Sequence, residues 1–176
     1  VVNYSRFKTV TINEIKSNTW TEEARGNNLT VTAPDSRIII TDRASVNEIV
    51  SIGNSLKINV SGKLGRVLVN GSKNLILDGE AQKTNLVLNS ADAKVTSSIP
   101  TCVTLHETGT FVFEKGAKGS IINQSSNASK PVIQNNTSGE IVITGENTSQ
   151  STSQPNTGRS QWNSNSGSNN GGNDNN

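Results

Sequence analysis

Short apolar runs recur along this chain at regular intervals, and every second run resembles its counterpart after one fixed period. Leu56 lies one period before Leu75, and the segment 67–70 (VLVN) lies the same distance before the segment 86–89 (LVLN). A period of roughly 18 to 20 residues is typical of a solenoid, in which each coil is one structural unit stacked on the next. The spacing therefore favours a stacked architecture over most other folds.

The runs themselves have the composition of β-strands. They are rich in Val, Ile, Leu and Thr, and Gly, Asn, Ser or Asp separates most of them, as expected for strands joined by turns. Apolar and polar residues alternate within a run, as in 56–60 (LKINV), which predicts one buried and one solvated face. A loose helical stripe occurs in residues 13–25, where we expect a short helix or a capping loop.

These patterns predict an all-β fold, a right-handed parallel β-helix of roughly six coils with a small N-terminal cap. The handedness is the usual one for parallel crossover connections. Counterparts one period apart should then stack: Leu56 on Leu75, Val67 on Leu86, and Asn70 on Asn89 as a side-chain amide ladder. An antiparallel β-sandwich is the alternative fold, although it would not require residues to repeat at a fixed offset.

Composition divides the chain into three parts. Residues 1–45 are expected to form the N-terminal cap and first strands, and residues 46–145 the solenoid body. Residues 146–176 consist almost entirely of Asn, Ser, Gly, Gln and Thr, so they predict a disordered tail or linker. The chain begins Val1-Val2, without an initiator Met or a leader, which suggests a processed protein or a piece of a larger one.

A known group of proteins contains sequence segments similar to three segments of this repeat: 67–72 (VLVNGS), 75–79 (LILDG) and 86–90 (LVLNS). These three segments resemble the β-helix segments of secreted and surface-layer-associated proteins of Gram-positive bacteria. The resemblance covers about residues 45–95 and implies the fold and an extracellular or cell-surface address, but no particular activity. The segment 154–158 (QPNTG) is also similar to the Leu-Pro-x-Thr-Gly sorting signal of Gram-positive surface proteins, but it begins with Gln and no hydrophobic segment follows it.

Several functional classes are disfavoured by composition. One His and one Cys among 176 residues are too few for a disulfide framework or a zinc or haem site, so we expect no cofactor and no metal. No apolar run approaches the roughly 18 residues of a membrane helix, which argues against membrane insertion. A net charge of +2 without a Lys- or Arg-rich run argues against nucleic acid as a partner. Cys102 lies in an apolar stretch and is expected to be buried.

Enzymatic activity is also disfavoured. A polysaccharide lyase on a β-helix would need clustered carboxylates, commonly around Ca²⁺, with a basic residue such as Arg66 beside them. No two of the acidic candidates named below repeat at the coil offset, and His106 is predicted to point outward and to take no part in catalysis. The acidic candidates are Asp78, Glu80, Asp92, Glu107 and Glu114.

The sequence is best explained by a non-catalytic extracellular spacer or interaction module of a cell-surface or secreted protein. Its partner would be a cell-wall or plant polysaccharide, or another surface protein. A polysaccharide-binding module is the alternative, since sugar sites commonly use aromatic platforms, and a lyase-like enzyme is the third candidate. The candidate binding residues, for which the sequence offers only weak signals, are Trp20, Asp78, Glu80 and Arg66.

Overall fold

The computed structural model describes residues 1–80, 83–90, 92–124 and 130–145, and within them the chain forms parallel strands in two sheets. Sheet A contains the odd-numbered strands: β1 (Val2–Asn3), β3 (Thr19–Glu22), β5 (Ser36–Ile40), β7 (Ser55–Val60), β9 (Asn74–Gly79), β11 (Ala93–Ser97), β13 (Gly109–Phe113) and β15 (Val132–Asn135). Sheet B contains the even-numbered strands: β2 (Phe7–Ile12), β4 (Arg25–Val31), β6 (Ser45–Ser51), β8 (Lys63–Val69), β10 (Thr84–Leu88), β12 (Thr101–Leu105), β14 (Ile121–Gln124) and β16 (Val142–Thr144).

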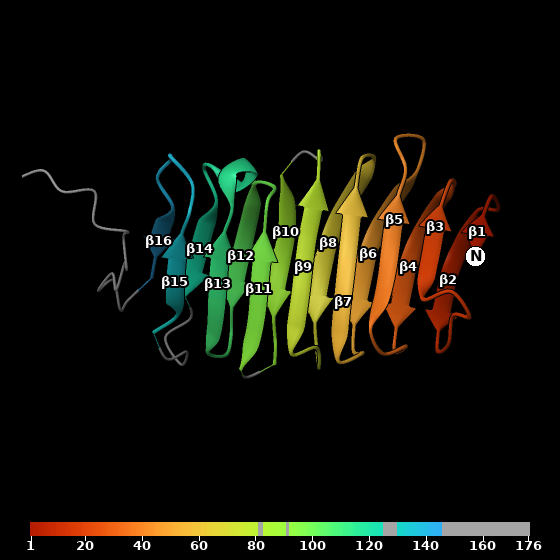
Figure 1. Ribbon diagram of the computed structural model, residues 1–176, viewed down its shortest axis with the longest axis horizontal. Helices are drawn as coiled ribbons and strands as arrows, with labels where there is room; N and C mark the ends of the chain where they lie inside the picture. The colour runs from red at the N-terminus through yellow and green to blue at the C-terminus, as the bar shows by residue number, and fades with distance from the viewer. Residues whose placement is uncertain (81–82, 91, 125–129, 146–176) are drawn as a thin grey trace, which may run out of the picture.

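The two sheets are the opposite walls of a solenoid (Figure 1). In Figure 1 the strands of sheet A run upward in front, those of sheet B run downward behind, and the chain advances from right to left. This path is a right-handed coil, as predicted from the crossover rule. Each coil contributes one strand to each sheet, so sequence neighbours face one another across the core while hydrogen-bonded neighbours lie one coil apart.

The predicted stacking of like residues is confirmed. Leu56 pairs with Leu75, and Val67 pairs with Leu86. The Nδ2 of Asn89 donates a hydrogen bond to the Oδ1 of Asn70 at 3.0 Å, which is the predicted amide ladder. The repeat in the sequence therefore reports direct contact between successive coils.

Apolar side chains, at every second position of a strand, point inward and fill the interior of the solenoid. Strand β7 follows the pattern, because Leu56, Ile58 and Val60 are buried and the residues between them are half-buried on the outer face. Phe111 and Phe113 share the inner face of β13, stacked with ring centroids 6.3 Å apart, so they belong to the core. The core is thus one continuous apolar column enclosed by both sheets.

The N-terminal segment differs from two expectations. The short helix or capping loop considered for residues 13–25 is replaced by β3 and the start of β4, because the apolar stripe there is too weak to outweigh pairing with the next coil. The two sheets already begin at β1 and β2, and each contains eight strands, so the solenoid has more coils than the six predicted. Strands on both sides of residue 45 pair in the same parallel manner.

Cys102 is half-buried on the outer face of β12, so the expectation of a buried cysteine was wrong. Its neighbours Thr101 and Val103 occupy the inward positions, and strand alternation then turns Cys102 outward. Of the described residues, none lies in a helix long and apolar enough to cross a membrane. The tail predicted for residues 146–176, including the segment 154–158, lies outside the described residues.

Candidate functional site

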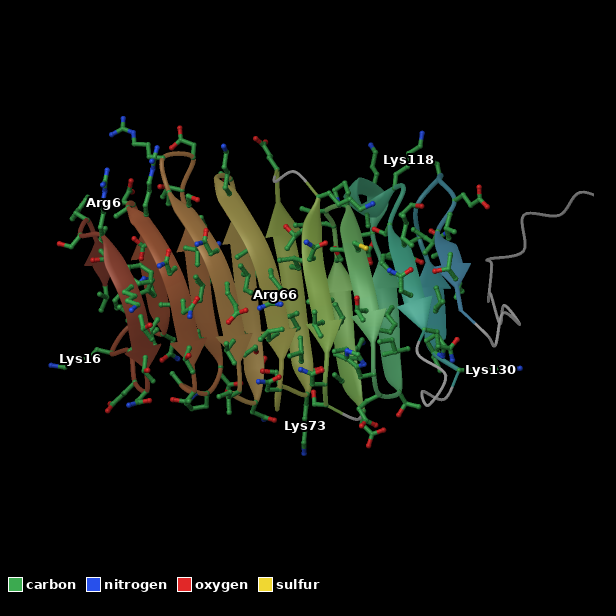
Figure 2. All side chains as sticks on the ribbon, turned by 180° about the vertical axis from the view of Figure 1, so that it is seen from behind. Arg6, Lys16, Arg66, Lys73, Lys118 and Lys130 are labelled. Atoms are coloured by element: carbon green, nitrogen blue, oxygen red, sulfur yellow. The ribbon has the colours of Figure 1, made fainter. Side chains whose placement is uncertain are left out.

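The turns of the solenoid form two long edges with different surroundings. We call the turns that follow strands of sheet A the upper edge, and those that follow strands of sheet B the lower edge. Figure 2 shows Arg6 and Lys118 on the upper edge, Lys16, Lys73 and Lys130 on the lower edge, and Arg66 on the wall formed by sheet B.

Three adjoining hollows lie on the upper edge, in the turns leading into β6, β8 and β10, with volumes of about 410, 260 and 250 Å³. Lys63 lines all three hollows, and Ser45 lines two of them. Arg25, Ser45 and Lys63 are register partners in consecutive coils, and the largest of the three hollows spans these coils. The other two hollows both span the coils of residues 42–47, 61–65 and 80–83. We call this surface, from Arg25 to Lys83, the upper groove.

Glycine and backbone shape the floor of the upper groove. A Cβ atom at Gly62 would lie 2.1 Å from the carbonyl oxygen of Thr41 and 2.4 Å from that of Ala44 in the preceding coil. That close approach leaves no room for a side chain. The backbone N–H groups of Ser45 and Lys63 donate to the carbonyls of Ala24 and Ala44, each at 3.1 Å, so these polar groups are already paired.

The charged side chains of the upper groove are mainly cationic. Arg25, Arg43, Lys63 and Lys83 line it and are exposed, and Asp42 and Glu80 line it as well. Within the described part of the chain, the one ion pair joins Arg66 to Glu48 on the wall of sheet B. The four cations therefore keep their charges available to solvent or to a ligand.

Trp20, the aromatic candidate, lies on β3 in register with buried Ile38. Its Nε1 donates to the Oε2 of Glu22 at 3.1 Å, and the ring packs against the core. The indole is half-buried at the N-terminal end of the solenoid and does not form a flat exposed platform for a sugar ring.

Asp78 lies at the end of β9 and forms part of a polar ladder between coils. Its Oδ1 accepts hydrogen bonds from the Ser98 hydroxyl and from the backbone N–H of Gly79, each at 2.8 Å. The Ser98 hydrogen bond is the main reason that the pKa of Asp78 is lowered from its usual 3.8, helped by Gly79 and the charge of Lys57 and opposed by desolvation. A carboxylate held ionised in this way is suited to stabilising a turn.

The other two candidates occupy different surfaces. Glu80 lies in the turn after β9 and lines the upper groove beside Lys63 and Asp42. Arg66 lies on β8, where its Nε donates to the Oε2 of Glu48 on β6 at 2.9 Å. The structure therefore brings one of the four predicted residues, Glu80, into the upper groove and distributes the others elsewhere.

The carboxylates considered for a lyase are divided between the two edges. Asp78, Glu80 and Glu114 are at the upper edge, whereas Asp92 and Glu107 follow strands of sheet B at the lower edge. Among the described residues, no three His, Cys, Asp or Glu side chains are grouped so as to hold a metal ion. His106 is exposed on the lower edge, as predicted from strand alternation.

Comparison with known proteins identified no related protein. No family model, no curated protein and no solved structure matches this chain.

The cations of the upper groove are not apparent in the sequence because they are far apart in it. Arg43, Lys63 and Lys83 lie one coil apart along the chain, so no local window contains a basic run. Compared at the coil offset, the five acidic candidates form no column. The same comparison of Lys and Arg positions would have shown that Arg43, Lys63 and Lys83 recur at that offset.

Proposed function

We propose that this protein is a non-catalytic rod, a structural spacer or interaction module of a cell-surface or secreted protein. One observation carries the proposal: parallel pairing continues without a break from β1 to β15 in sheet A and from β2 to β16 in sheet B. With a rise of about 4.8 Å per coil, the eight strands of each sheet span about 34 Å. Stacked coils resist bending because each one packs on its neighbours.

The non-catalytic part of the proposal is supported by the distribution of reactive groups. The five carboxylates considered for a lyase are divided between the two edges, and His106 is exposed on the lower edge. General acid–base catalysis requires groups within hydrogen-bond reach of one substrate. In the part of the chain that the structure describes, no three His, Cys, Asp or Glu side chains are grouped so as to hold a metal ion such as the Ca²⁺ of a lyase.

Small-angle X-ray scattering of the whole chain tests the rod. We expect the scattering of one elongated particle, together with strong amide protection from hydrogen exchange in the central strands β5–β12. A profile of two independently moving bodies, or rapid exchange in the central strands, would contradict the spacer.

An assay for lyase products tests the non-catalytic part. Acidic and neutral polysaccharides are incubated with the protein, with and without Ca²⁺, and followed by ultraviolet absorbance of unsaturated sugar products. We expect no product, and time-dependent product formation would replace the spacer with the lyase-like enzyme.

The extracellular or cell-surface address is part of the same proposal and is supported by the resemblance of the repeat segments in 67–90. Protease treatment of intact source cells tests it. We expect the protein to be cleaved on intact cells or recovered from the medium, and protection until the cells are lysed would contradict this address.

A further inference from the structure

We propose that the upper groove binds an anionic polysaccharide, laid along the rod across the coils that contain β4, β6, β8 and β10. This inference names the partner of the interaction module proposed above and rests on that function. The groove would recognise carboxylate or sulfate groups on a polymer that is rich in hydroxyl groups.

The direction of the groove fits a linear polymer. Strand register aligns Arg25, Ser45 and Lys63. Arg43, in the turn before β6, and Lys83, in the turn before β10, add positive charge beside this row. Because coils are about 4.8 Å apart, Arg25 and Lys63 are separated by about 10 Å along the axis. A chain lying parallel to the axis would meet a cation repeatedly.

The mixture of groups in the groove favours a sugar chain over a polyphosphate. Asp42 and Glu80 lie among the cations, where their carboxylates can accept hydrogen bonds from sugar hydroxyls, which a polyphosphate lacks. Ser45 and Ser61 add hydroxyl groups to the lining. A polymer that carries many hydroxyls as well as negative charges matches this pattern.

Two other partner classes fit less well. Single-stranded nucleic acid is usually held by aromatic stacking in addition to charge, and no aromatic residue of the described chain lines the three hollows. A peptide could bind by strand addition only to free backbone groups. The N–H groups of Ser45, Gly62 and Lys63 already donate to the preceding coil.

Binding of the whole chain to four immobilised polymers tests the proposal: polygalacturonate, dextran sulfate, uncharged dextran and oligothymidylate. We expect saturable binding to one or both anionic polysaccharides and none to dextran. Raising the salt from about 0.05 M to about 0.5 M should weaken this binding at least about tenfold, since charge pairs at an open surface are screened. The two anionic polymers distinguish carboxylate from sulfate recognition.

A matched pair of double variants localises the site. Lys63→Gln with Lys83→Gln removes two exposed cations from the upper groove, and Lys16→Gln with Lys73→Gln removes two exposed cations from the lower edge (Figure 2). We expect the upper variant to bind about tenfold or more weakly and the lower variant to stay within about twofold of wild type. Circular dichroism checks that both variants fold.

Equal losses in the two variants, comparable binding to dextran, tighter binding to oligothymidylate, or no binding to any polymer would overturn the proposal. The salt response of the wild-type chain tests it even where a variant folds poorly. Failure here leaves the scattering and product assays of the spacer unaffected, so the two proposals can fail separately.

Discussion

At the scale of single residues, the most unusual group is a carboxylate inside the first coils. The side chain of Glu22 is fully buried and accepts hydrogen bonds from the Asn3 Nδ2 at 2.9 Å, the Trp20 Nε1 at 3.1 Å and the Ala24 N–H at 3.0 Å. A buried charge is tolerated only when its hydrogen-bonding capacity is met. Glu22 therefore ties β1, β3 and the turn to β4 together at the N-terminal end.

Replacing Glu22 by Ala is expected to lower the free energy of unfolding by about 1–3 kcal/mol, because three donors lose their acceptor. Urea denaturation measures the change. Glu14→Ala is the control, since Glu14 is exposed on the lower edge, and it should alter stability by less than about 0.5 kcal/mol. Equal effects of the two substitutions would show that the Glu22 contacts contribute nothing.

Asp78 predicts a pH dependence of known sign. Its pKa in the folded protein is lowered from 3.8, chiefly by the Ser98 hydrogen bond, so its contribution is fully present above about pH 4 and is lost as the pH falls through the lowered value. The difference in unfolding free energy between wild type and Asp78→Asn should therefore shrink on acidification. NMR titration of the Asp78 carboxyl carbon should show its pKa rising toward 3.8 in Ser98→Ala, and an unchanged pKa would contradict this cause.

At the scale of elements, the turns are determined by how closely successive coils approach. Gly79, at the end of β9, has a φ of +127°, and a Cβ there would lie 2.1 Å from the carbonyl oxygen of Val60. Gly119 also has a positive φ, +80°, but a Cβ there would meet nothing within 4 Å. A substitution at Gly119 would therefore introduce backbone strain alone, whereas one at Gly79 would introduce backbone strain and a collision with the neighbouring coil.

We expect Gly79→Ala to destabilise the protein clearly more than Gly119→Ala. Both substitutions place a side chain where φ is positive, at a cost of about 1 kcal/mol or more, whereas Gly79→Ala must also push two coils apart. Thermal and urea unfolding of both variants measure the difference. Equal losses would mean that the coils near Gly79 separate easily.

At the scale of the whole molecule, stability should depend on position along the rod. Each coil contacts only its neighbours, and the central coils have two neighbours whereas the terminal coils have one. Leu77 is fully buried and pairs with Ile58 and Ser97, whereas Ile143 is half-buried in β16 and pairs with Ile122.

Leu77→Ala is expected to cost about 2–5 kcal/mol because it leaves a cavity in the packed core, and Ile143→Ala should cost less than half as much. Equilibrium unfolding gives both values. Hydrogen exchange should show that Ile143→Ala weakens protection mainly in β14 and β16. A global loss of protection from Ile143→Ala would contradict nearest-neighbour stability.

Much of the fold could be predicted because, in a solenoid, residues that contact each other in successive coils recur at a fixed spacing in the sequence. The pairs Leu56–Leu75, Val67–Leu86 and Asn70–Asn89 follow from the coil period alone, since stacking places like environments one period apart. The weak helical stripe at 13–25 was misleading because local periodicity says nothing of pairing with Arg37 and Ile38 in the next coil.

Strand composition, the coil period and the inward and outward alternation follow from the sequence, because they depend on local geometry and on burial of apolar side chains. Which polar residues meet depends on how the coils stack. Lys63 and Lys83 join Arg25 and Arg43 in one groove, Glu80 joins them, and Arg66 pairs with Glu48 instead. Because turns vary in length between coils, the position of a surface charge is established only when each coil is stacked on the preceding one.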